Sequence, residues 1–270
     1  MRQKFKINRP KKSLGQSFLK DNRIIEKITD SCCLSSGDTV LEIGPGHGEL
    51  TERLVEKAGR VVAVEIDAAL CRILEEKFAI FKNLQIICKD FLKFDFDTCF
   101  HDFSGKIKVI GNIPYYISSP IIERLLGRAD KIDTVFLTVQ KEFARRLVSE
   151  PGSKEYGSFS LFTQYYTEPK LLFYIKKGSF KPAPKVDSAF IRLRIRQEPA
   201  VKLDNEELFF KIIRAAFSQR RKKITNGLKG IVAAQALESF FLRYGFNRMV
   251  RPENLSLQDF ANLTNCTSDF

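Results

Sequence analysis

The amino-acid sequence predicts an α/β fold with a small all-α domain at its C-terminal end. In the first part of the chain, short apolar runs alternate with segments of helical spacing, which is the pattern of a sheet with crossover helices. These runs lie at residues 39–43, 60–64, 84–88 and 107–110. After Pro199 the apolar spacing becomes purely helical. We therefore expect one domain over residues 1–198 and a second, helical domain over residues 199–270.

The first apolar run leads directly into a glycine-rich turn at residues 44–48 (GPGHG), after which a helix is expected. A strand, a glycine turn and a helix begin a nucleotide-binding unit, because glycines let the backbone approach a ligand closely. Glu65 ends the next run, 21 residues after Gly44, and can hold the two hydroxyls of a ribose. Asp90 follows the third run and can accept a hydrogen bond from an adenine amino group, although an acid there is also typical of a helix cap.

The spacing of the glycines separates two classes of cofactor. The turn reads G-x-G-x-G, whereas dinucleotide-binding enzymes carry G-x-G-x-x-G to seat a pyrophosphate. A smaller adenosine cofactor, S-adenosylmethionine, therefore fits better. We expect the first domain to be the Rossmann-like sheet of an S-adenosylmethionine-dependent methyltransferase.

The fourth apolar run ends in Asn112, Ile113, Pro114 and Tyr115. The carboxyl ends of strands are where ligands bind in open α/β sheets. Asn112 offers an amide oxygen, and Tyr115 offers a flat ring. Pro114 offers a backbone carbonyl on a rigid segment, and we expect this carbonyl to lack a local N–H partner. These groups can hold an exocyclic aromatic amine. A turn with a buried pair of tyrosines, Tyr115 and Tyr116, is the alternative interpretation.

Composition indicates the kind of partner. The 270 residues include 45 Lys and Arg against 32 Asp and Glu, a net charge of +13, which favours nucleic acid first and an anionic membrane surface second. Six basic side chains lie between Arg2 and Lys12, where they could contact phosphates. No apolar run reaches the length of a membrane span, only two histidines are present, and no CxxC occurs. We expect a cytoplasmic monomer without a metal site or disulfides.

Several motifs together resemble the KsgA-type small-subunit (16S) ribosomal RNA adenine dimethyltransferases, a family that also includes the Erm enzymes. They lie at residues 14–19 (LGQSFL), 42–46 (EIGPG), 112–115 (NIPY), 140–142 (QKE), 156–158 (YGS), 180–188 (FKPAPKVDS) and 217–222 (FSQRRK). The resemblance covers nearly the whole chain. It implies methylation of N6 in two adjacent adenosines of a hairpin loop near the 3′ end of 16S RNA, within an immature small subunit. The helical domain would then bind RNA or the ribosome.

The resemblance also implies which residues form the site. Contacts with S-adenosylmethionine are expected at Ser17, Leu19, Gly44, Glu65, Asp90 and Asn112. Ser17 departs from the family, which usually has asparagine there; a backbone contact would survive this change, but a side-chain contact would be shortened. For the transfer itself we expect Asn112 and Pro114 to hold N6, and the flipped base to stack between Tyr115 and Phe180.

Three other functions remain open. A DNA adenine or protein glutamine methyltransferase could use a similar tetrapeptide, but Ile113 and the loop at residues 180–188 argue against both. An Erm-type enzyme acting on large-subunit (23S) RNA is closer, although the basic cluster Arg220–Lys223 and the loop at Tyr156 favour the KsgA type. A ribosome-assembly factor with secondary catalysis would fit the charge equally well.

Overall fold

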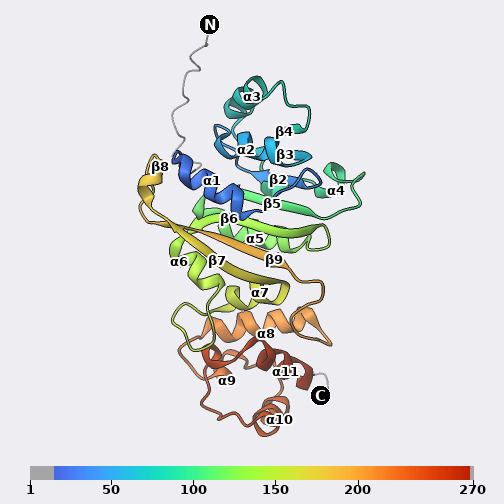
Figure 1. The fold of residues 1–270 in the computed structure, drawn as a ribbon. Helices are drawn as coiled ribbons and strands as arrows, with labels where there is room; N and C mark the ends of the chain where they lie inside the picture. The colour runs from blue at the N-terminus through green and yellow to red at the C-terminus, as the bar shows by residue number, and fades with distance from the viewer. Residues whose placement is uncertain (1–14, 268–270) are drawn as a thin grey trace. The chain divides into compact units, whose positions relative to one another are not determined.

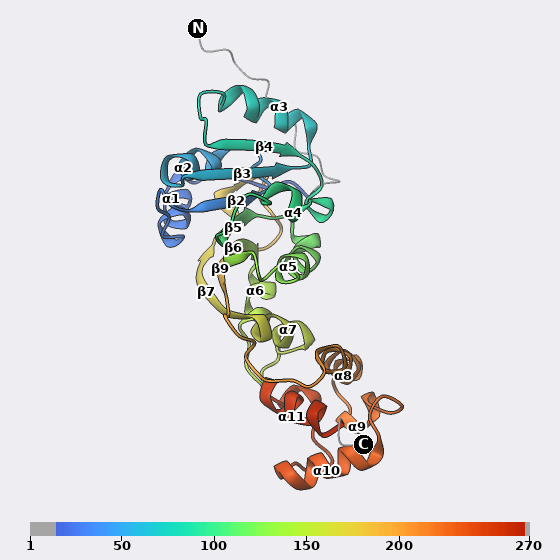
Figure 2. The ribbon, with the colours of Figure 1, turned by 90° about the vertical axis from the view of Figure 1, so that its right-hand side faces the viewer.

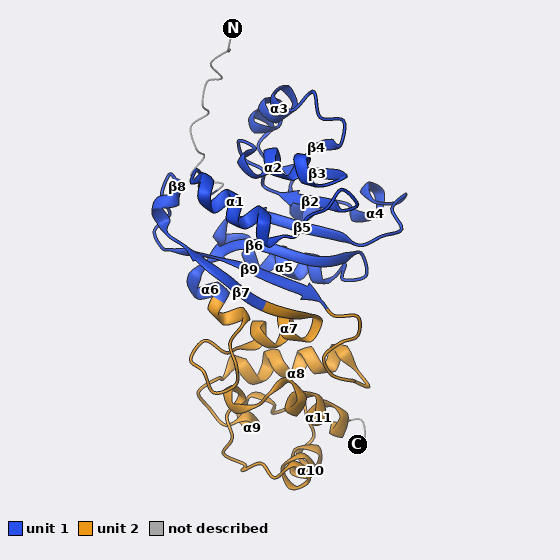
Figure 3. Cartoon of the chain, in the orientation of Figure 1, with its two compact units in different colours: residues 1–144, 170–195 blue, residues 145–169, 196–270 orange. Residues whose placement is uncertain are grey.

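The computed structural model describes residues 15–267, so the basic segment predicted at Arg2–Lys12 lies outside the described residues. The chain forms two compact units (Figure 3). The first consists of the described residues up to Ala144 together with Lys170–Ile195, and the second consists of Arg145–Pro169 and the described residues from Arg196 onward.

A seven-stranded mixed sheet forms the centre of the first unit, with the order β4-β3-β2-β5-β6-β9-β7. Its strands are β2 (Thr39–Ile43), β3 (Arg60–Glu65), β4 (Leu84–Cys88), β5 (Ile107–Asn112), β6 (Ile132–Gln140), β7 (Thr167–Ile175) and β9 (Ser188–Ile195). The first five of these pair in parallel, and Figure 2 shows β4, β3 and β2 side by side, whereas β9 joins β6 in antiparallel register. Strand order reverses between β2 and β5, so ligands are expected at the carboxyl ends of these strands.

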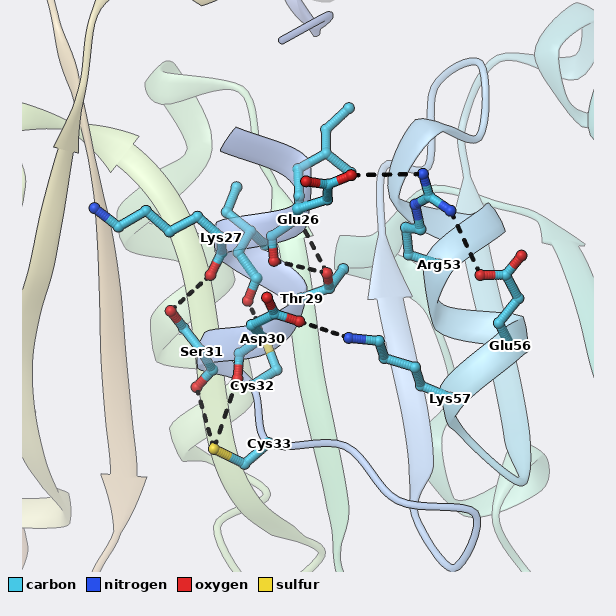
Figure 4. A network of polar contacts seen from close by, with 12 residues as sticks. Glu26, Lys27, Thr29, Asp30, Ser31, Cys32, Cys33, Arg53, Glu56 and Lys57 are labelled. Carbon is cyan, nitrogen blue, oxygen red and sulfur yellow. Dashed lines mark hydrogen bonds and ion pairs between the residues drawn. The ribbon is translucent and has the colours of Figure 1, made fainter. Parts of the chain in front are cut away.

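Helices connect the parallel strands, as the alternating pattern predicts (Figure 1). The connecting helices are α2 (Glu49–Lys57), α3 (Ala68–Lys77), α4 (Phe96–Cys99) and α5 (Ser118–Leu126), while α1 (Asn22–Ser31) precedes β2 and α6 (Lys141–Leu147) follows β6. Apolar residues of α1 and α2, among them Ile28 and Leu54, pack on the sheet. Ion pairs join these two helices on their outer side, with Lys57 Nζ 2.7 Å from Asp30 Oδ1 and Arg53 4.0 Å from Glu26 (Figure 4). None of the helices among residues 15–267 is both long and apolar enough to span a membrane.

A small two-stranded sheet, which the sequence pattern does not predict, joins distant parts of the first unit. β1 (Phe18–Leu19) pairs antiparallel with β8 (Phe180–Lys181), and Leu19 lies opposite Phe180. The Lys20 N–H extends this contact by donating to the carbonyl of Ser179 at 2.9 Å. The segment before α1 is thereby fixed beside the proline-rich loop that begins at Phe180.

The second unit is helical and has its own aromatic core. Its helices are α7 (Ser158–Tyr166), α8 (Glu206–Ser218), α9 (Ile224–Gly227), α10 (Ala234–Tyr244) and α11 (Leu257–Thr267). Asn205 caps α8, and Tyr156, Phe209, Phe240 and Phe260 are fully buried. The unit contains residues 145–169 in addition to the segment predicted at residues 199–270, because α7 packs against α8 and α11. The assignment of RNA binding to this unit stays a prediction.

Candidate active site

A cavity of about 740 Å³ opens at the carboxyl ends of β2, β3, β4 and β5. The structure brings seven of the predicted site residues to this cavity: Ser17, Gly44, Glu65, Asp90, Asn112, Pro114 and Tyr115. They come from the ends of separate strands and from the segment before α1. The cavity therefore lies at the edge of the sheet that the sequence indicates.

The glycine turn keeps the floor of the cavity free of side chains. Gly44 and Gly46 have φ values of +68° and +63°, which L-residues rarely adopt. A Cβ on Gly46 would lie only 2.8 Å from the Phe18 ring, so any other residue there would displace that ring. The Gly44 N–H donates to the Val64 carbonyl at 3.0 Å and fixes the turn on β3. The backbone at Gly44 and Gly46, which lines the cavity, is thus preformed for close approach by a ligand.

Glu65 is a buried carboxylate held by backbone N–H groups. It is 4% exposed; Oε2 accepts from Gly46 N at 3.2 Å, and Oε1 accepts from Asp67 N at 2.9 Å. Burial raises the pKa of Glu65, and the backbone hydrogen bonds oppose part of that rise. The backbone N–H of Ile66 also stabilises the carboxylate, and the remaining acceptor capacity can serve a ribose hydroxyl.

A second buried carboxyl, Glu42, lies in β2 just before the glycine turn. It is 1% exposed, and its Oε2 accepts from Thr51 Oγ1 at 2.7 Å, whereas Oε1 has no hydrogen-bond partner within the described part of the chain. Burial raises the pKa of Glu42 to about 8. Glu42 is therefore mostly protonated near neutral pH. It is not among the residues that line the cavity.

Asp90 caps a short helix and also lines the cavity. Its Oδ1 accepts from Leu92 N at 2.9 Å and so caps the short helix η2 (Phe91–Lys93). The residue also lines the cavity beside the buried Phe91. One carboxylate oxygen stays outside the cap and can accept from an adenine amino group.

Asn112 has a fixed orientation that decides what it can do. Its Nδ2 donates to the Ser17 carbonyl at 3.0 Å, so Oδ1 is left as an acceptor at the cavity. Ser17 is itself held, because its Oγ donates to the Pro182 carbonyl at 2.6 Å. Ser17 thus acts on Asn112 through its backbone, and its side chain positions the proline-rich loop.

Pro114 and Tyr115 start the short helix η3 (Tyr115–Ile117). The expectation that the Pro114 carbonyl lacks a local partner is wrong, since it accepts from Ile117 N at 3.2 Å in this turn. A carbonyl has two lone pairs, so one position remains for a ligand. The Tyr115 hydroxyl forms a hydrogen bond with Ser188 Oγ, and burial raises the pKa of that hydroxyl. This bond fixes the ring at the cavity wall.

Two predicted residues are not brought to the cavity. Leu19 and Phe180 are 3% and 4% exposed and belong to the core beneath α1, where the pairing of β1 with β8 places them. Pro182 and Lys185 of the same loop line the cavity instead. The structure therefore does not provide Phe180 as the second stacking surface for a base.

Two further lining residues, Ile66 and Tyr116, were not predicted, and both are well exposed. Each directly follows a predicted site residue, and this adjacency is the signal that could have found them. No cluster of three or more His, Cys, Asp or Glu side chains suited to a metal ion occurs within residues 15–267.

A second, basic cleft of about 820 Å³ lies within the helical unit, lined by residues that include Lys154, Arg220, Arg221, Lys222 and Arg251. Arg220 already has partners within the unit: its Nε lies 2.7 Å from Glu253 Oε2 in an ion pair, and its guanidinium donates to the Ser153 carbonyl at 3.1 Å. Arg221, Lys222 and Lys223 are exposed and form no ion pair with other described residues. These three are therefore the members of the predicted cluster that can meet a phosphate.

The sequence matches the family of ribosomal RNA adenine dimethylases over residues 7–269. This chain belongs to that family. It is 40% identical over 266 residues to "Ribosomal RNA small subunit methyltransferase A" of Clostridium botulinum (strain Langeland), covering 98% of this chain and 95% of that protein. It is 42% identical to the protein of the same name from Geobacillus sp. (strain WCH70), with coverage of 94% and 90%.

Two solved structures resemble this rRNA adenine dimethylase over most of its length. The 23S rRNA methyltransferase ErmE aligns with a TM-score of 0.73 and 28% identity, covering 93% of this chain and 99% of ErmE. A dimethyladenosine transferase from Plasmodium falciparum aligns with a TM-score of 0.76 and 26% identity, covering 91% and 95%. These comparisons confirm the predicted Rossmann-like methyltransferase fold and an S-adenosylmethionine-dependent rRNA adenine dimethyltransferase activity.

The residues at the cavity fit this cofactor. The side-chain-free turn at Gly44 and Gly46 and the buried Glu65 suit an adenosine, and Asp90 lies where an adenine amino group can be recognised. When bound, S-adenosylmethionine supplies an electrophilic methyl group on a sulfonium. The protein's own residues must then hold and orient the amine that receives it.

Proposed function

We propose that this enzyme dimethylates N6 of two adjacent adenosines in the 3′-terminal hairpin loop of 16S rRNA, in immature small ribosomal subunits. Two relatives named for the small subunit, at about 40% identity over nearly the whole chain, support this choice of RNA. We also propose that it works as a cytoplasmic monomer. The site residues Gly44, Glu65, Asp90 and Asn112 would hold the cofactor, with Ser17 contributing through its backbone.

The orientation of Asn112 is the observation that carries the mechanism. Adenine N6 is a weak nucleophile, because its lone pair is delocalised into the ring. Since Nδ2 of Asn112 is bound to the Ser17 carbonyl, Oδ1 is presented as an acceptor, and the Pro114 carbonyl has one free lone pair nearby. We infer that these two oxygens accept the two N6 hydrogens, which turns the nitrogen lone pair toward the methyl group.

The base must leave its stack to reach this position, and Tyr115 provides the surface on which it stacks. Hydrogen bonding to Ser188 keeps the Tyr115 ring in place before the base arrives. After the first transfer one N6 hydrogen remains, so one of the two acceptors is released and the first methyl is accommodated in the cavity. Each methylation leaves N6 positively charged, so one of its hydrogens becomes acidic and is lost to water as a proton. Alignment therefore suffices for both transfers, and a strong base is not required.

We propose that basic side chains of the helical unit bind the RNA. Arg221, Lys222 and Lys223 are exposed beside the basic cleft of the helical unit and can meet phosphates. The basic residues between Arg2 and Lys12 are proposed as a second contact.

An Erm-type activity on 23S RNA is the second candidate, because the fold is also similar to that of ErmE. Nucleotide mapping separates the two. Ribosomal RNA from cells with and without the gene is analysed for N6,N6-dimethyladenosine, and the purified enzyme is offered unmethylated small subunits, large subunits and naked RNA. We expect two adjacent modified adenosines near the 3′ end of 16S RNA and turnover on small subunits. Modification of 23S RNA would support the Erm-type activity, and binding without turnover would indicate an assembly factor.

A further inference from the structure

Tyr116 is an aromatic side chain at the cavity that the mechanism does not use. It lines the cavity directly after Tyr115, but 64% of the residue is exposed. The two neighbouring tyrosines differ in their contacts. The Tyr115 hydroxyl is bound to Ser188, whereas the Tyr116 hydroxyl has no hydrogen-bond partner among the described residues. A large exposed ring without polar contacts at the edge of a site is available to a ligand.

The position of Tyr116 is set by its surroundings. Gly15 lies against the ring so closely that a Cβ there would be 3.1 Å from Tyr116 Cε1. Gly15 also has a φ of +59°, so both its conformation and its contact with Tyr116 favour glycine. The backbone that carries the ring is fixed by η3 and by the hydrogen bond from Ile117 N to the Pro114 carbonyl. The ring is therefore held on one side and open on the other before any substrate binds.

We propose that Tyr116 stacks the nucleotide next to the adenosine that is being methylated. The inference rests on the proposed function, in which the two target adenosines are adjacent. When one base is flipped into the cavity its neighbour loses a stacking partner, and an exposed aromatic ring at the edge of the cavity replaces that partner. Tyr115 then holds the reacting base and Tyr116 holds the base beside it.

This assignment has a consequence for the two adenosines. A single ring with one open face can take one neighbour, either the 5′ or the 3′ nucleotide. When the first adenosine is in the cavity, its partner lies on the 3′ side, and when the second is in the cavity, its partner lies on the 5′ side. The ring therefore meets the partner adenosine in one transfer and the nucleotide outside the pair in the other, and because stacking on an aromatic ring tolerates any base, loss of Tyr116 should slow both methylations.

The first test compares three variants on unmethylated small subunits. Base–aromatic stacking predicts that Tyr116→Ala raises KM about 5- to 150-fold, with a much smaller change in kcat because the groups that hold N6 are intact. Tyr116→Phe keeps the ring and should restore the wild-type KM. Tyr174→Ala removes a tyrosine of β7 that is 46% exposed and does not line the cavity, and it should leave KM unchanged. Thermal melting and calorimetric binding of S-adenosylmethionine verify that Tyr116→Ala is folded with an intact cofactor site.

The second test asks whether the base itself is the partner. Small subunits are reconstituted with 16S RNA in which the nucleotide on either side of one target adenosine is abasic. One of the two abasic positions should raise the wild-type KM as much as Tyr116→Ala does, and combining both changes should add nothing further. A Tyr116→Ala enzyme with wild-type KM would overturn the inference. So would a rise in KM from Tyr116→Ala that is as large on both abasic substrates as on intact RNA. Failure of wild-type enzyme to methylate small subunits at all would instead overturn the proposed function.

Discussion

Replacement of Asn112 by alanine and by aspartate tests the orientation of its amide. In the structure Nδ2 donates to the Ser17 carbonyl at 3.0 Å, and Oδ1 is free to accept from N6. Alanine removes both groups. Aspartate keeps an acceptor but places a second oxygen against the Ser17 carbonyl, where a donor is needed, so the ionised side chain cannot hold the same position. Aspartate is therefore not a conservative change at this site.

The size of each effect follows from these contacts. Loss of one preorganised polar group that acts mainly in the transition state costs about 10²–10³-fold in kcat. Alanine also leaves the Ser17 carbonyl without its donor, which should lower the free energy of unfolding by about 1–3 kcal/mol. At neutral pH the aspartate variant should lose a similar factor in kcat. As pH falls, its protonated carboxyl can donate to Ser17 again, so its activity relative to wild type should rise.

The assay is methyl transfer to unmethylated small subunits at saturating S-adenosylmethionine, measured as a function of pH. Thermal melting reports whether each variant is folded. A folded Asn112→Ala enzyme with near wild-type kcat would refute the proposed hold on N6. An aspartate variant that matches wild type at high pH would refute the assigned direction of the amide.

Three other expectations concern carboxylates and charge. Glu65→Ala should weaken S-adenosylmethionine binding by about 1–3 kcal/mol, measured by calorimetry. Because burial raises the pKa of Glu65, the wild-type affinity for S-adenosylmethionine should fall as pH is lowered. Glu65→Gln should remove this pH dependence. Burial raises the pKa of Glu42 to about 8, so the folded protein keeps a proton on Glu42 that the unfolded chain loses. The free energy of unfolding of the wild type should therefore fall by up to about 4–5 kcal/mol as pH rises from the pKa of an ordinary glutamate to above 8. Denaturation curves of Glu42→Gln should lack this fall. Neutralising Arg221 and Lys222 should reduce the salt dependence of small-subunit binding by roughly one unit of slope per lost phosphate contact. Lys106→Gln on the first unit should leave the slope unchanged. An unchanged slope in the Arg221 and Lys222 variant would show that these side chains do not contact phosphate.

The parts of the fold that the sequence predicts are those governed by local pattern. The apolar runs identify the central parallel strands, and the glycine turn with Glu65, Asp90 and Asn112 identifies their ligand-binding edge. The pairing of β1 with β8 could not be predicted, because two-residue strands have no periodicity and pair across a long separation. The inward position of Phe180 depends on that pairing.

The division of the chain into units was harder to predict for a similar reason. Residues 145–169 come after β6 and run into β7, two strands of the sheet, so the sequence order favours placing them with the sheet. They pack with the C-terminal helices instead, where Tyr156 is fully buried and donates to the Leu255 carbonyl at 2.9 Å. Only tertiary packing specifies that choice.

The double attachment of Ser17 bears on when during synthesis the active site becomes complete. Its carbonyl orients an amide 95 residues further along the chain, and its hydroxyl holds a carbonyl 165 residues further along. A nascent chain that has left the ribosome only as far as Asn112 already contains the glycine turn and Glu65, but lacks the segment to which the Ser17 hydroxyl is attached. Contacts of such long separation form after local ones. The enzyme should therefore acquire cofactor-binding elements early and an oriented Asn112 only after Pro182 has been synthesised and β8 has paired with β1.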